Sequence, residues 1–172
     1  MQIADNLVVE GTISSTGNIT IPSGSTITDA IQNGNAQCTT ALVANTNTTL
    51  ANITGLSVNV TAGGTYNVRA HLNGSTNASG GIKVAFSGSG NATSSNVTTW
   101  NWNGTTLNAV TNQTTWGSAI TSGNVAFTDI VVEGAIVVNA GGNITLAAAQ
   151  NAAFAGNTTI AAGSTMTVSR VS

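Results

Sequence analysis

The chain has 172 residues, among them three Lys or Arg, five Asp or Glu and one His, and its formal net charge is −2. Nucleic-acid binding is excluded, because the chain has no run of basic residues that could neutralise phosphates. So few acids and bases argue against an enzyme, a metal site or a bound cofactor. Hydrophobic residues make up 41% of the chain, which excludes intrinsic disorder because disordered chains combine low hydrophobicity with high charge.

Residues 1–35 contain short apolar strands that are interrupted by glycines and by the single proline, Pro22. Each strand is too short to bury its own apolar face, and such segments become ordered by pairing with copies of themselves or with another protein's sheet. We therefore expect residues 1–35 to be an extended β arm that attaches the protein to a larger assembly. The contact residues expected in this arm are Leu7, Val8, Val9, Ile13, Ile19, Ile21 and Ile27.

Residues 36–48 show no clear strand period, and we interpret them as a linker that could hold a loop or a short helical turn. They contain Cys38, the single cysteine of the chain, so a disulfide within the chain is excluded. Cys38 is either a small, partly buried apolar residue or one half of a bridge to another chain.

From residue 49 onward, apolar and polar residues alternate with a period of two, which is typical of strands with one buried face. The clearest example is Tyr66–Leu72, where Tyr66, Val68, Ala70 and Leu72 share one face. Further strands are expected at 56–60, 81–86, 97–102, 125–138, 144–148, 158–160 and 166–168. Many short strands between glycine- and asparagine-rich turns predict an all-β sandwich or barrel.

Six motifs in this region stand in an order similar to that of the phage version of the C1q/TNF-like jelly-roll family. They are GLSV at 55–58, GTYNVRAHL at 64–72, GGIKVAFSG at 80–88, VEGAIVV at 132–138, GNITLAAAQN at 142–151 and AAGSTMTVSRV at 161–171. The resemblance implies an antiparallel jelly-roll β-sandwich over residues 49–172 that forms a tight homotrimer. Met166 departs from the family, because related chains often have a larger residue there.

Trimerisation also has a physical basis that is independent of the family. A sandwich with so few charges leaves apolar surface that a monomer covers poorly. Closed threefold assembly would bury this surface and protect the edges of the sheets.

Arg69, His71 and Lys83 are the cationic candidates, and they would share one surface if their strands were neighbours. They would form either a solvated outer face or ion pairs with Asp129 or Glu133 across a subunit interface. A catalytic His71 is not expected, because the spacing suggests no nucleophile or carboxylate partner. The two carboxylates could hold calcium only if backbone carbonyls or a threefold axis supplied the other ligands.

Trp100 and Trp102 lie on one face of an expected strand, with asparagines on the other face. One interpretation is partial packing in the core, with the indole N–H groups bonded at the rim. In the other, Trp100, Trp102 and Trp116 form an exposed platform on which sugars stack while asparagine side chains bond the hydroxyls.

The resemblance implies a protein of the virion, because domains of this family decorate phage heads or form fibres. Together with the low charge and the expected arm, it leads us to expect a viral structural protein, a trimeric capsid decoration or cement protein of a bacteriophage. Its arms would contact the major capsid protein and staple neighbouring capsid subunits, with multivalency supplying the strength. The alternative is a tail-fibre or spike tip that binds a host surface glycan. Without a signal peptide or a membrane span in the sequence, we expect synthesis in the host cytoplasm, no membrane partner and a place on the outer surface of the virion.

Overall fold

The computed structural model describes residues 33–76 and 79–172, which belong to one compact unit, Ile31–Ser172. All regular structure in these residues is β-strand, and they include no helix that could cross a membrane. The strands are β1 (Asn33–Gln37), β2 (Leu42–Ala44), β3 (Ala51–Val60), β4 (Thr65–Thr76), β5 (Lys83–Ser87), β6 (Ala92–Asn103), β7 (Thr106–Gln113), β8 (Ile120–Thr121), β9 (Phe127–Val138), β10 (Gly142–Ala149), β11 (Thr158–Ile160) and β12 (Thr165–Arg170).

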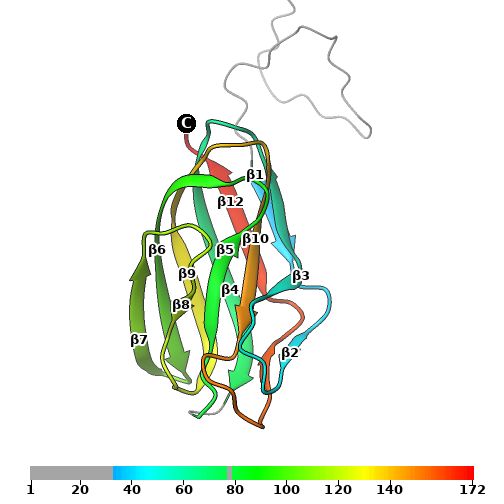
Figure 1. The fold of residues 1–172 in the computed structure, drawn as a ribbon, viewed down its shortest axis with the longest axis vertical. Helices are drawn as coiled ribbons and strands as arrows, with labels where there is room; N and C mark the ends of the chain where they lie inside the picture. Colours follow the sequence, from blue (N-terminus) through cyan, green and yellow to red (C-terminus); the bar gives the residue numbers. More distant parts are fainter. Residues whose placement is uncertain (1–32, 77–78) are drawn as a thin grey trace, which may run out of the picture. The chain divides into compact units, whose positions relative to one another are not determined.

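The strands form two antiparallel sheets that pack face to face (Figure 1). The larger sheet has the order β1-β12-β4-β9-β6-β7, with β11 beside β4 and β2 beside β11, and the smaller sheet has the order β3-β10-β5-β8. If β1, β3, β4, β5, β8, β9, β10 and β12 are numbered one to eight, the sheets read 1-8-3-6 and 2-7-4-5. This is the strand order of a jelly roll, so the expected antiparallel jelly-roll β-sandwich is confirmed.

The hairpin of β6 and β7 is an addition to these eight strands. It is inserted between β5 and β8 in the chain and extends the larger sheet beyond β9. Gly104, with a φ of 61°, lies in its turn, where glycine adopts a positive φ without steric cost. The hairpin therefore widens the outer face of the larger sheet.

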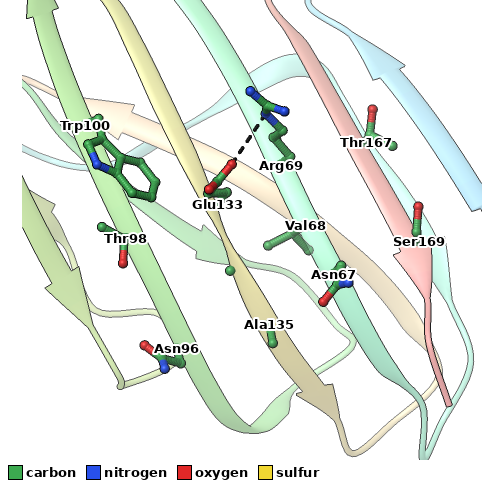
Figure 2. A pocket seen from close by; sticks show the side chains of 11 residues that line it. Asn67, Val68, Arg69, Asn96, Thr98, Trp100, Glu133, Ala135, Thr167 and Ser169 are labelled. Atoms are coloured by element: carbon green, nitrogen blue, oxygen red, sulfur yellow. Dashed lines mark ion pairs between the residues drawn. The ribbon is translucent and has the colours of Figure 1, made fainter.

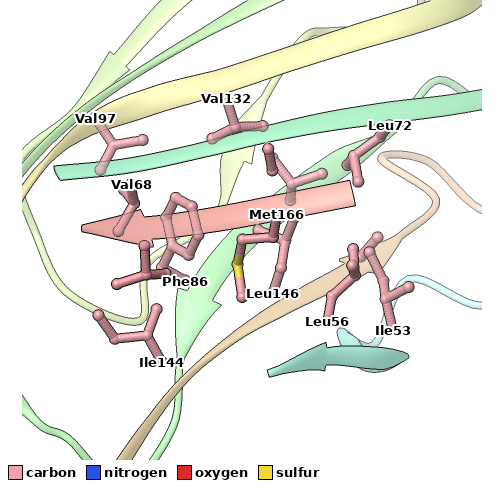
Figure 3. Close-up of a cluster of buried hydrophobic side chains, with 14 of the residues drawn as sticks. Ile53, Leu56, Val68, Leu72, Phe86, Val97, Val132, Ile144, Leu146 and Met166 are labelled. Carbon is pink, nitrogen blue, oxygen red and sulfur yellow. The ribbon is translucent and has the colours of Figure 1, made fainter. Parts of the chain in front are cut away.

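The core lies between the two sheets and consists of the apolar residues that alternate along the strands. Tyr66, Ala70 and Leu72 of β4 are 0% exposed, as the period of two predicts. Figure 3 shows Leu56 and Leu146 of the smaller sheet in the same buried cluster as Val68 and Leu72 of β4, with Met166 between them. Because Met is flexible and unbranched, it fills such a gap without a larger side chain.

The structure moves the start of the folded domain from residue 49 to Asn33. β1 pairs with β12, with Asn33 opposite Ser169, and β2 pairs with β11. Cys38 between them is 1% exposed. Residues 36–48 are therefore part of the sandwich and not a linker, because the edges of β12 and β11 offer backbone hydrogen bonds to β1 and β2. The rest of the expected arm, with its contact residues from Leu7 to Ile27, lies outside the described residues.

Candidate functional site

A shallow hollow of about 550 Å³ lies on the outer face of the larger sheet, over β12, β4, β9 and β6 (Figure 2). Apart from the buried Val68 and from Gly134, the residues that line it alternate with inward-facing residues, so the same period that builds the core turns these side chains outward. The neutral polar side chains of the lining are Asn67, Asn96, Thr98, Thr167 and Ser169.

The floor of the hollow is formed by two small residues of β9, Gly134 and Ala135. Ala135 stands opposite Asn67 on β4 and opposite Asn96 on β6. A Cβ atom at Gly134 would collide with the backbone oxygen of Asn96. Small side chains here allow β6 to approach β9 closely and leave space between the longer side chains on either side.

An ion pair crosses the hollow from β4 to β9. Arg69 and Glu133 are opposite each other in the register, and Arg69 Nε lies 3.5 Å from Glu133 Oε2. The two side chains are 71% and 43% exposed, so the pair contributes only about 0–1 kcal/mol to stability. Arg69 and Glu133 are the one cation and the one anion of the lining, so the hollow carries no net charge.

Asn112 of β7 orients two polar side chains on β6. Its Nδ2 donates to Asn96 Oδ1 at 2.8 Å and to Thr98 Oγ1 at 3.2 Å. The amide NH₂ of Asn96 and the hydroxyl hydrogen of Thr98 are not used in these bonds and are available as donors. The inserted hairpin thus holds one wall of the hollow in place.

Trp100 and Trp102 are both half-buried on the outer face of β6, while Asn101 between them is 0% exposed and faces inward. The predicted division of the strand into an indole face and an amide face is confirmed, but the indoles do not pack in the core. Trp100 lines the hollow, and Trp102 is opposite Asp129 at the next outward position. Trp116, by contrast, packs against the core cluster, so the three indoles do not form one platform.

His71 and Asp129 form a second pair on the same outer face, with His71 Nε2 3.2 Å from Asp129 Oδ1 and both side chains partly exposed. Asp129 and Glu133 are the ion-pair partners expected from the sequence, but that expectation placed the pairs across a subunit interface, whereas the pairing of β4 with β9 brings them together. Both pairs form within one chain. Lys83 does not join the other cations, since it lies on β5 in the smaller sheet.

The described residues offer little else for chemistry. They contain no group of three or more His, Cys, Asp or Glu that could hold a metal ion. The thiol of Cys38 is buried and lies 3.2 Å from the carbonyl oxygen of Thr40, and burial raises the pKa of this thiol. Cys38 is therefore a buried apolar residue, one of the two interpretations of the sequence, and a bridge to another chain would need an exposed thiol.

No protein-family model matches the chain, and no curated protein matches it either. Among solved structures, it is similar to the crystal structure of the infectious bursal disease virus VP2 subviral particle, with 13% identity and a TM-score of 0.25. The match covers 83% of this chain and 40% of that chain. The structure of the Gx strain of the same virus gives 13% identity, a TM-score of 0.22, and coverage of 90% and 45%. The chain thus spans less than half the length of either protein, and TM-scores this low do not show a common fold.

Proposed function

We propose that the protein is a structural component of a bacteriophage virion, a C1q/TNF-like jelly roll that trimerises and decorates the capsid. The observation that carries this proposal is that all six motifs lie on strands of the jelly roll. Each of the six motifs falls on a different strand of the eight that build the jelly roll: β3, β4, β5, β9, β10 and β12. This agreement supports the family resemblance and the function that it implies.

The surface of the sandwich supports the homotrimer. Val43, Leu107, Val110 and Val171 are large hydrophobic residues that are 42% to 56% exposed. β1 and β7 are the end strands of the larger sheet and have an unpaired edge among the described strands. Assembly would remove part of this apolar surface from water and cover strand edges that otherwise invite unspecific pairing.

The arm is the proposed tether to the shell. Its apolar residues, such as Val8, Val9 and Ile13, would add strands to sheets of the major capsid protein. Three arms joined by one trimer would bridge neighbouring capsid subunits, and their combined binding would exceed that of a single arm. On the outer surface of the virion, this arrangement would act mechanically and without catalysis.

Deletion of residues 1–30 tests the tether, because it leaves β1 and the compact unit from Ile31 onward intact. We expect the shortened protein to keep its oligomeric state but to be missing from purified particles. A matched control changes Ser14 and Ser15 to threonine, which alters the arm without removing apolar residues, and it should be incorporated normally. Normal incorporation of the deletion variant would contradict the proposed role of the arm.

The second candidate is a tail-fibre or spike tip that binds a host glycan. The half-buried Trp100 beside neutral polar side chains favours it. Gold-labelled antibody on intact particles separates the two candidates, because decoration places the label over the head and a fibre places it at the tail. Label confined to the tail would overturn the decoration proposal.

A further inference from the structure

We propose that the hollow on the outer face of the larger sheet binds a neutral carbohydrate. The inference deepens the glycan-binding candidate by assigning its site and its class of ligand, and it applies equally to a protein on the shell and to one in a fibre. It rests on three properties of the lining: an aromatic ring, fixed neutral donors and acceptors, and a balanced charge.

The aromatic ring is the indole of Trp100. Figure 2 shows it extending from β6 along one side of the hollow, near Glu133, while Arg69 stands on the other side. One face of a sugar ring consists mainly of C–H groups, which pack against an indole while the hydroxyls point sideways to polar partners. The small residues Gly134 and Ala135 leave room for such a ring beside the indole.

The donors and acceptors lie on both walls. On the β6 side, Asn112 fixes Asn96 and Thr98 through bonds of 2.8 and 3.2 Å. On the other side, Asn67 and Ser169 are opposite each other on β4 and β12. Side chains that are already oriented lose less freedom when a ligand binds, which suits ligands that carry many hydroxyls.

The charge of the lining selects against ionic ligands. Arg69 and Glu133 are paired at 3.5 Å, so a phosphate or sulfate would have to compete with Glu133 for the guanidinium. A hydroxyl group can instead donate to the carboxylate and accept from the guanidinium without separating them. The volume of about 550 Å³ also falls in the range of about 300–1,000 Å³ that is usual for sites of small ligands.

The test uses the full-length protein and three neutral oligosaccharides as probes: maltoheptaose, cellohexaose and triacetylchitotriose. Binding is followed by tryptophan fluorescence and by saturation-transfer NMR. We expect saturable binding of at least one of them and weaker binding of a sulfated heparin hexasaccharide. Failure of all three to bind, or stronger binding of the sulfated probe, would overturn the inference.

Two substitutions on the same face of β6 locate the site. Trp100→Ala should weaken binding about tenfold or more, whereas the matched control Trp102→Ala should change it by less than about twofold. Thr98→Val, which keeps the shape and the strand propensity of the side chain, should also weaken binding even if Trp100→Ala fails to fold. Equal effects of the two tryptophan variants would contradict the assignment to the hollow.

The other occupant of this face would be a second copy of the chain. Sedimentation velocity of Trp100→Ala distinguishes the two occupants. If this variant loses both the oligomer and sugar binding, the hollow is a subunit interface and the carbohydrate proposal is rejected. We expect an unchanged oligomer and unchanged incorporation into particles. Failure of the carbohydrate site would thus leave the deletion test of the arm unaffected.

Discussion

The hydroxyl of Tyr66 is bound to Thr61 through both backbone and side chain. The backbone N of Thr61 donates to Tyr66 Oη at 2.9 Å, and Thr61 Oγ1 lies 3.0 Å from the same oxygen. Thr61 follows β3 of the smaller sheet, and Tyr66 is near the start of β4 of the larger sheet. The interaction therefore fixes the turn by which the chain crosses from one sheet to the other.

Tyr66→Phe should lower the free energy of unfolding by about 1–2 kcal/mol, because it removes these hydrogen bonds but keeps the ring in the core. The measurement is urea denaturation followed by tryptophan fluorescence. Asn67→Ala, at the next and exposed position, is the control and should change stability by less than about 0.5 kcal/mol. Equal stability of Tyr66→Phe and the unmodified protein would contradict the structural role of the hydroxyl.

Gly134→Ala should lower stability by about 1–3 kcal/mol, because the added Cβ meets the backbone of β6 and must push the strand away. The atoms it would contact are the backbone oxygen of Asn96 and, at 2.7 Å, the Cα of Val97. Ala135→Ser adds an atom at the neighbouring exposed position and should have little effect. If both variants unfold at the same urea concentration, β6 does not approach β9 as closely as described.

Asn101→Leu should raise the melting temperature. The side chain is 0% exposed, and neither Oδ1 nor Nδ2 has a hydrogen-bond partner among the described residues. An unpaired buried amide costs about 1–3 kcal/mol, and leucine has nearly the same shape without that cost. Asn96→Leu, on the opposite face of β6, should give no such gain because its amide is bonded to Asn112. A lower melting temperature for Asn101→Leu would show that the amide is satisfied.

Alkaline pH should destabilise the protein partly through Cys38. Burial raises the pKa of its thiol in the folded protein, so the unfolded chain loses this proton at a lower pH. The stability that comes from keeping the buried thiol protonated is complete below the pKa of this thiol in the unfolded chain, and it is lost as the pH rises through the higher pKa of the folded protein. Thermal unfolding at pH 7.5 and pH 10 should show a smaller loss for Cys38→Ala than for the unmodified protein. Identical losses would mean that the thiol ionises equally in both states.

The sequence predicts the strands that have one buried face, because burial itself imposes the alternation. Tyr66–Leu72 lies within β4, and the Asn103-Gly104 turn joins β6 to β7 as its residues indicate. β1, with the sequence NGNAQ, has no apolar alternation. β1 is a strand because it pairs with β12. This pairing is a tertiary interaction that cannot be predicted from the local sequence.

The candidate site could be predicted only in part for the same reason. The outward direction of Trp100 follows from the period of β6, but its neighbours come from β4, β9 and β12. The pairing of Arg69 with Glu133 depends on the register between β4 and β9. Asn96 and Asn112 carry no distinguishing signal in a chain so rich in asparagine, so their hydrogen bond is visible only in the folded protein.

The proposed function requires that this jelly roll forms a closed threefold assembly. Sedimentation velocity of the full-length protein in dilute solution tests it most directly. We expect one species with three times the 17.0 kDa mass of a single chain. A stable species of 17.0 kDa at every concentration would contradict it.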